Sequence, residues 1–344
     1  MEIAPASGTQ SEVSAVVIAL AAPPDCAVVD ANADAARLFD TTLPAMRGAS
    51  LVALLAEAGV LGPLRNTICS ALVANGACSA RIHFAGGAYA NDREITVIAT
   101  REHASPHLQV TVSERDSDAA LNEFDLAPEA IVDVISHELR SPLNATLVWA
   151  TLLEMDDAPT TVKKASAIIR DNVRAQARLI DDLVEVSRAP TQVMPADARR
   201  IDIAELVAQT LTEAREYVAA NIVLDSAGRC CAVDADPGRL QRALHHLLRN
   251  AATAMPDGGT ISTAIVSSGD SVCVTIADQG AGMTSEQIAN AFRPLRRTDR
   301  SGGAGLGLAV VWAIIRQHGG SVCVSSRGVG LGSTVAFSLP IACD

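Results

Sequence analysis

Residues 121–188 constrain the fold most, because they contain no glycine and carry apolar residues at three- and four-residue spacing. That spacing is typical of helices with one apolar face. A polar break at 156–161, which contains Pro159, divides the stretch into two. The stripes are wider than one hairpin can bury, so residues 121–190 are predicted to form an antiparallel helical hairpin that dimerises into a four-helix bundle. The apolar positions are Ile131, Val134, Ile135 and Leu139 in the first helix, and Ile168, Ile169, Val173, Leu179, Ile180 and Leu183 in the second.

The regions on either side of the hairpin have different patterns. Residues 14–115 alternate short apolar runs with Gly, Pro and Asp, which indicates strands at 26–30, 95–100 and 108–113. Residues 200–342 follow a linker near 189–198 and mix helical with strand patterns, which favours an α+β sandwich. Helices are expected there at 203–219, 237–255 and 305–318, and antiparallel strands at 221–225, 260–266, 271–277, 321–325 and 333–339.

Composition excludes several functions. The 344 residues carry 27 Lys and Arg against 39 Asp and Glu, and this net charge of -12 argues against a nucleic-acid or anionic-membrane surface. No apolar run approaches the ~18 residues of a membrane span, and the run at 15–22 follows Glu2 and Glu12 rather than basic residues. A cytoplasmic protein is therefore expected. The eight cysteines lack CxxC spacing, and Cys273 and Cys323 lie in apolar runs, which favours buried reduced thiols.

The first helix of the hairpin carries the string ISHELRSPLN at 135–144. It resembles the phosphoacceptor motif of two-component sensor histidine kinases, and the resemblance makes His137 the nucleophile that attacks the γ-phosphate of ATP. A neutral imidazole is nucleophilic near neutral pH. Glu138 would hold a proton on the other ring nitrogen, and Ser141, on the same helix face as His137, could position water for dephosphorylation. The alternative is an incidental histidine on a solvated helix, which the full string disfavours.

Residues 200–342 resemble the ATP-binding half of the same family, an α/β sandwich shared with gyrase-like ATPases. The resemblance implies that Asn250, in the helix opened by DPGRL, ligates Mg²⁺, which prefers oxygen ligands. It also implies that Asp278 in DQGAGM accepts a hydrogen bond from the adenine amine, with Gly280 and Gly282 letting the backbone approach the base.

A second glycine-rich segment, GAGLGL at 303–308, leads into a helix whose N-terminus suits the triphosphate. Its expected nucleotide-binding residues are Gly303, Gly305, Leu306 and Gly307. Phe292 and Arg297 match the mobile lid of the family, where the arginine would face phosphate and the aromatic ring would pack the lid shut. The segment GLGST at 330–334 and the strand after it would close the domain.

Three positions depart from the family pattern. His246 stands where asparagine is usual, Thr253 where a basic residue is common, and Leu295 where a second lid aromatic is common. These departures bear on nucleotide affinity and rate more than on fold. Gyrase-like ATPases carry a water-activating glutamate at the turn of His246, and its absence favours transfer to a histidine over hydrolysis.

Near the N-terminus, VVDANADAARLF at 28–39 and MRG at 46–48 resemble the start of a PAS sensor domain, a five-stranded sheet with helices on one face. The similarity covers about 14–115 and identifies no ligand. His83, His103 and His107 are candidate haem ligands, although surface or structural roles are favoured. A ligand-free dimerisation or protein-contact module is as well supported as a small-molecule sensor.

Together these resemblances predict a homodimeric, PAS-linked sensor histidine kinase that uses ATP and Mg²⁺. The chain has no receiver-like acidic domain, so the phosphoryl acceptor would be an aspartate of a separate response regulator. Two alternatives stay open. One is an enzyme that mainly dephosphorylates its regulator, which Ser141 permits; the other is a catalytically weak scaffold that binds nucleotide and regulator, which His246 and Thr253 motivate.

Overall fold

The computed structural model describes residues 16–20, 27–31, 33, 36, 41–50, 53–54, 77–83, 93–101, 108–116, 128–155, 158–188, 197–226, 232–268, 270–294 and 305–342. None of the helices in these ranges is both long enough and apolar enough to cross a bilayer. Cys273 and Cys323 lie in the same ranges and are buried free thiols, which confirms the prediction made for these two positions.

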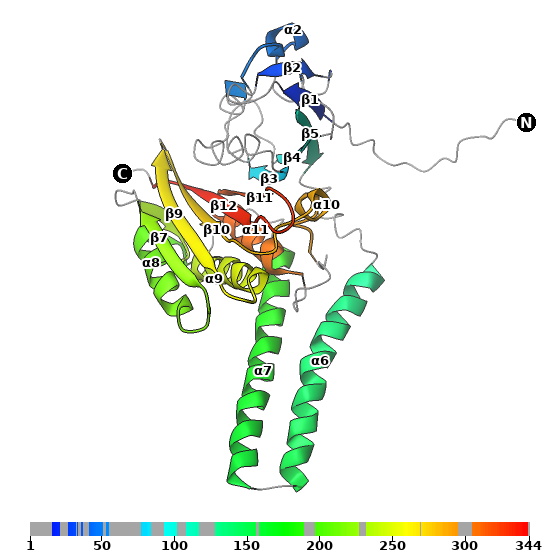
Figure 1. Cartoon of the computed structure of the whole chain (residues 1–344), viewed down its shortest axis with the longest axis vertical. Helices are drawn as coiled ribbons and strands as arrows, with labels where there is room; N and C mark the ends of the chain where they lie inside the picture. Colours follow the sequence, from blue (N-terminus) through cyan, green and yellow to red (C-terminus); the bar gives the residue numbers. More distant parts are fainter. Residues whose placement is uncertain are drawn as a thin grey trace, which may run out of the picture.

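The predicted helical hairpin is present as α6 (Pro128–Met155) and α7 (Pro159–Arg188), which lie side by side (Figure 1). Pro159 opens α7, a position at which a helix does not need the missing N–H group. The helix α6 continues through Pro142, whose carbonyl oxygen accepts a hydrogen bond from Thr146 Oγ1 at 2.9 Å. Gln176 Nε2 of α7 donates to the Leu139 carbonyl oxygen at 3.3 Å, so a cross-helix bond lies two residues from His137.

The C-terminal half is a sheet packed against helices, as the sequence predicts. The helices are α8 (Ile203–Ala214), α9 (Pro237–Ala254) and α11 (Gly307–Gln317). The strand order is β11 (Ser321–Ser326), β12 (Ser333–Pro340), β10 (Ser271–Ala277), β9 (Thr260–Ser268) and β7 (Asn221–Ser226). Neighbouring strands are antiparallel except β7 and β9, which are parallel, so the expectation of antiparallel strands was wrong for this pair.

Three short elements were missed from the sequence. The strands β6 (Arg199–Asp202) and β8 (Ala232–Ala235) pair as a separate two-stranded sheet, and α10 (Ser285–Ala289) follows β10. Segments of four or five residues are too short to display a period. The helix α8 ends at Ala214 rather than near the expected residue 219, because residues 215–217 form a turn.

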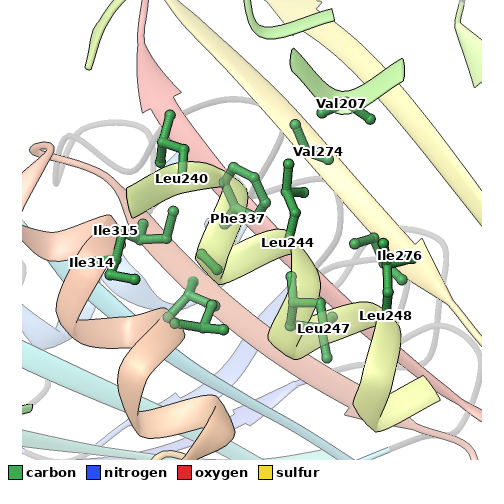
Figure 2. Close-up of a cluster of buried hydrophobic side chains, with 14 of the residues drawn as sticks. Val207, Leu240, Leu244, Leu247, Leu248, Val274, Ile276, Ile314, Ile315 and Phe337 are labelled. Carbon is green, nitrogen blue, oxygen red and sulfur yellow. The ribbon is translucent and has the colours of Figure 1, made fainter. Parts of the chain in front are cut away.

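Aliphatic side chains of α9 form the centre of the core. Figure 2 shows Leu240, Leu244, Leu247 and Leu248 of α9 between the side chains of α11 and those of the sheet. These four leucines are no more than 2% exposed and follow the spacing of one helix face. Burial of each such side chain contributes about 1.5–3 kcal/mol. The neighbours labelled in the figure are Val207, Val274, Ile276, Ile314, Ile315 and Phe337.

The C-terminal end of α7 belongs to this same core. Val186 is 4% exposed, and Leu179 and Leu183 pack against the buried cluster of the C-terminal half. The sequence assigned Leu179 and Leu183 to the four-helix bundle. Periodicity identifies an apolar face but not its partner, and the structure packs these residues against the core of the C-terminal half, where α7 lies beside α11.

We expect His318 to make the stability of the C-terminal half depend on pH. Its Nδ1 donates to the Ile314 carbonyl oxygen at 2.7 Å, and its Nε2 accepts from the Asp236 backbone N–H at 3.0 Å, so the neutral ring is fully bonded. Burial lowers the pKa of His318 below its ordinary value of 6.5, against opposing effects of Ile314, Asp236 and Glu185. Below pH 6.5 the unfolded chain takes up a proton that the folded chain resists, and stability falls.

Thermal unfolding at pH 8 and pH 5.5 measures this effect. The wild-type chain should lose more stability between these values than His318→Ala does. At pH 8 the variant itself should be less stable by about 1–3 kcal/mol, because the Asp236 N–H at the start of α9 loses its acceptor. Equal pH dependence of the two proteins would contradict the role of His318.

The N-terminal strands form a sheet of order β2 (Val28–Ala31), β1 (Val16–Leu20), β5 (Leu108–Asp116), β4 (Arg93–Arg101) and β3 (Ala77–His83), with antiparallel neighbours. The strands expected at 26–30, 95–100 and 108–113 correspond to β2, β4 and β5. The short helix α2 (Leu43–Met46) lies beside β2.

One feature of the sheet was not expected from the sequence. The strand β3 also pairs antiparallel with β11, with Ala77 opposite Ser326 and Arg81 opposite Val322, so a single ten-stranded sheet joins the two halves (Figure 1). An edge strand offers unpaired N–H and C=O groups to any strand that reaches it. Local patterns cannot show which edges meet.

Candidate functional site

Asp278 follows β10 and is held by hydrogen bonds from its own loop and from Ser333, the first residue of β12. Its Oδ1 accepts from the Gly280 N–H at 2.8 Å and from the Ser333 N–H at 3.2 Å, and its Oδ2 accepts from the Ser333 hydroxyl. A carboxylate offers about four acceptor positions, and these bonds use three. The half-buried carboxylate is therefore rigid and keeps acceptor capacity for one more donor.

The glycines beside Asp278 serve loop packing. A Cβ on Gly280 would lie 2.4 Å from the Ala254 carbonyl oxygen, and one on Gly282 would lie 2.0 Å from the Gly328 carbonyl oxygen. Gly282 also has a φ of +63°, which favours glycine. From the sequence, both glycines were expected to let the backbone approach the adenine base, and this role stays a prediction. The structure adds a packing reason, because both glycines let the Asp278 loop lie against α9 and the 328–332 loop.

Asn250 meets the glycine loop at the start of α11. It lies exposed near the end of α9, and a Cβ on Gly307 would be 3.2 Å from both its Nδ2 and its Oδ1. Gly305 has a φ of +68°, and Leu306, only 3% exposed, anchors the loop in the core. The side chain of Leu306 makes no capping bond to the 11-residue α11. An amide oxygen and an uncapped helix N-terminus fit a metal–phosphate group.

The structure describes the other expected site residues to different extents. His137 and Glu138 lie in α6, where their backbone but not their side chains is described, and Ser141 is exposed one helical turn later. Arg297, Gly303 and Leu295 lie outside the described residues. Phe292 is 2% exposed within the core, which agrees with a packing role for this aromatic ring.

Thr253, one of the three departures from the family pattern, bonds within its own helix. Its hydroxyl donates back to the Arg249 carbonyl oxygen at 2.8 Å, one turn earlier on α9. The side chain carries no positive charge, unlike the basic residue that is common at this position.

Sequence reasoning missed a charged cluster, which we call the α7–α9 junction: Asp182 and Glu185 of α7 with Arg239, Arg242 and His246 of α9. Asp182 Oδ1 lies 2.6 Å from Arg242 Nη2 and 3.0 Å from His246 Nε2, and Glu185 Oε1 lies 3.3 Å from Arg239 Nη1. Burial raises the pKa of Asp182, but His246 and Arg242 outweigh burial and hold that pKa below its ordinary value. The sequence feature that could have indicated this cluster is the presence of two acidic residues, Asp182 and Glu185, within an apolar stripe of α7.

Two family descriptions match the parts of the chain that carry these residues. Residues 129–192, which include His137, match the His Kinase A (phospho-acceptor) domain, and residues 235–342 match the histidine kinase-, DNA gyrase B-, and HSP90-like ATPase. The chain has the architecture of a sensor histidine kinase. Within this architecture, Asn250, Asp278 and Gly307 all belong to the ATPase-like domain of the kinase.

Individual histidine kinases are similar to this chain over part of their length. The adaptive-response sensory kinase SasA of Synechococcus elongatus is 28% identical over 239 residues, which are 65% of this chain and 62% of that protein. The sensor protein KdpD of Rathayibacter rathayi is 31% identical over 257 residues, or 73% of this chain and 30% of that protein. The solved structure of full-length ShkA in complex with AMPPNP is 27% identical at a TM-score of 0.47, covering 63% of this chain and 46% of that chain. The chain thus spans less than two thirds of each.

Proposed function

We propose that this chain autophosphorylates on His137 with ATP and passes the phosphoryl group to an aspartate of a separate response regulator. The observation that carries the proposal is the occurrence, in one chain, of a phospho-acceptor domain and of an ATPase-like domain in which Asn250 lies beside Gly307 at the start of α11. ATP, bound with Mg²⁺, supplies the γ-phosphoryl group. Each site residue then has a proposed task.

At one end of the pocket, Asp278 accepts a hydrogen bond from the adenine amine at its free acceptor position. At the other end, the Asn250 amide oxygen ligates Mg²⁺ while Gly305, Leu306 and Gly307 turn the N–H groups of α11 toward the phosphates. Arg297, by its match to the family's lid segment, would face the phosphates, and Gly303 of the glycine-rich segment 303–308 would bind them; both residues lie outside the described residues. Positioning and electrostatic stabilisation of this kind supply most of the catalysis in phosphoryl transfer.

The transfer itself uses the α6 helix. An imidazole nitrogen of His137 forms the N–P bond as the bond from the γ-phosphorus to the bridging oxygen breaks, and ADP leaves with that electron pair. Glu138 holds the proton on the other ring nitrogen. In the second step the N–P bond breaks and the phosphoryl group moves to a carboxylate oxygen of the regulator.

The hairpin supports a homodimer. Large apolar side chains on both helices are between 39% and 79% exposed in the single chain, which is costly for α-helices in water. Packing two hairpins as a four-helix bundle would cover them. The residues are Leu143, Leu147, Val148, Leu152 and Met155 of α6, and Val162, Val173, Ile180 and Val184 of α7.

We also infer that the N-terminal strands form a PAS-like sensor region in a cytoplasmic protein. Five neighbouring antiparallel strands and the short helix α2 support this assignment. Its signal is open, and the candidate haem ligands His103 and His107 lie outside the described residues.

Incubation of the purified chain with γ-labelled ATP tests the proposed function. Label that is stable in base and lost in acid marks a phosphohistidine and supports the kinase. Nucleotide binding without any label would support the scaffold alternative, which the uncharged Thr253 side chain motivates.

Ser141→Ala separates a kinase from an enzyme that also dephosphorylates its regulator. Ser141 is exposed on the same face of α6 as His137, where its hydroxyl can orient water toward an incoming phosphoaspartate. Autophosphorylation should stay within a few-fold of wild type, whereas decay of regulator phosphate should slow by about tenfold or more. Equal decay rates with both proteins would leave Ser141 a structural helix residue. Thr151→Ala, further along α6, is a matched control because its hydroxyl bonds only the Leu147 carbonyl oxygen.

A further inference from the structure

The two ring nitrogens of His246 face different parts of the molecule. Its Nε2 lies 3.0 Å from Asp182 Oδ1, on the helix α7 of the hairpin. Its Nδ1 lies near the start of α11, where a Cβ on Gly307 would be 3.5 Å from it and 3.2 Å from Asn250 Nδ2 and Oδ1. The imidazole, with its side chain only 16% exposed, thus lies between the hairpin and the start of α11, which is proposed to bind the phosphates.

Asp182 is held firmly enough to orient this ring. Arg242 Nη2 lies 2.6 Å from the same carboxylate oxygen, and the carboxylate side chain is 12% exposed. The turns of α7 around it are fixed because Leu183 and Val186 pack into the core. Asp182 is therefore part of a rigid helix rather than a mobile surface group.

The carboxylates of the junction have guanidinium partners besides His246. Asp182 and Glu185 face Arg239 and Arg242, and Arg239 also lies 3.7 Å from Asp236 Oδ2. Because Asp182 accepts from Arg242 as well, its second contact, with Nε2, holds the imidazole ring in one orientation. A carboxylate that accepts from Nε2–H leaves Nδ1 as an acceptor, since the neutral ring carries one proton.

We propose that Asp182 and His246 are a positioning pair, in which Asp182 holds the proton on Nε2 and so presents Nδ1 as a hydrogen-bond acceptor beside Asn250 at the phosphate end of the pocket. The proposal rests on the proposed kinase function. Because Asp182 belongs to the hairpin, the pocket is complete only when the C-terminal half is docked on α7. His246, which departs from the family pattern, thereby couples docking of the C-terminal half on α7 to phosphoryl transfer.

Imidazole ¹⁵N spectra of the full chain without nucleotide test the pair independently of activity. In the wild type, His246 should show a protonated Nε2 and a bare Nδ1, with His246→Ala used to assign its signals. Asp182→Ala should remove this preference, and Asp182→Glu should keep it. Arg242 retains Glu185 at 4.0 Å in Asp182→Ala, and thermal unfolding checks that the fold persists. An unchanged tautomer in Asp182→Ala would overturn the proposal.

The initial rate of His137 labelling at saturating ATP, with ATP affinity measured separately, gives the second readout. Asp182→Ala and His246→Ala should each lower the rate about ten- to a hundred-fold, and the double variant should be no slower than the slower single variant. Asp181→Ala, an exposed neighbour on α7, should label at the wild-type rate. Fully additive losses would show independent residues and overturn the pair. Absence of label in the wild type would refute the kinase, and the spectra would still decide the pair.

Discussion

Replacing His137 with glutamine is expected to abolish acid-labile labelling by ATP, a loss of more than about a thousandfold. Glutamine has similar length and can hydrogen-bond, but its amide nitrogen is not nucleophilic. The loss should be complete because the transferred group has no other acceptor in the proposed reaction. Labelling over time, followed by acid treatment, measures it.

The same variant should bind ATP and dimerise as the wild type does. Position 137 lies on α6, whereas Asp278, Asn250 and Gly307 of the pocket lie in the C-terminal half. His245→Gln is a control for a histidine outside the acceptor helix, since His245 stacks on Tyr217 with ring centroids 5.9 Å apart. Wild-type levels of acid-labile label in His137→Gln would refute the assignment of the nucleophile.

Asp278→Asn is expected to weaken ATP binding about ten- to a hundred-fold. A hydrogen bond to a charged group is worth roughly 1.5–3 kcal/mol, which converts to that range of dissociation constants. The two backbone donors from Gly280 and Ser333 need an oxygen at Oδ1, so the new amide nitrogen should take the Oδ2 position. A donor then stands beside the adenine amine instead of an acceptor.

Nucleotide titration of folded protein measures this change. The Ser333 hydroxyl can turn and accept from the new amide, so the loops around Asp278 should stay closed and the unfolding temperature should change little. Asp257→Asn, an exposed carboxylate after α9, serves as a matched control. Identical affinities for Asp278→Asn and wild type would remove Asp278 from the adenine site.

Long elements with one clear period could be predicted from the sequence. The hairpin, α9 and α11 appear within a few residues of their expected bounds, because their apolar spacing is sustained over several turns. The strands β6 and β8 were missed because four residues display no period, and β7 was given the wrong direction relative to β9. Strand direction depends on connections and pairing, which the local pattern does not contain.

The candidate site, like the fold, could be predicted from the sequence only in part. Asp278, Asn250 and Gly307 were expected from motifs, and the structure brings Asn250 and Gly307 together. The pairing of Asp182 with His246 could not be predicted, because it joins residues 64 positions apart on helices that the sequence assigned to different domains. The packing role of Gly280 and Gly282 could not be predicted either, since the carbonyl groups they approach belong to the end of α9 and to the 328–332 loop, both distant in sequence.

The end of α7 limits how the hairpin and the C-terminal half can move relative to each other. This 30-residue helix has its first turns in the hairpin and its last turns in the core of the C-terminal half. While Leu179, Leu183 and Val186 stay packed there, the last turns of α7 move together with the C-terminal half. Any swing of the nucleotide pocket toward His137 must bend α7 before Leu179 or release these three side chains. A rotation of α7 about its axis would therefore be transmitted directly to the C-terminal half, which carries the proposed nucleotide-binding residues.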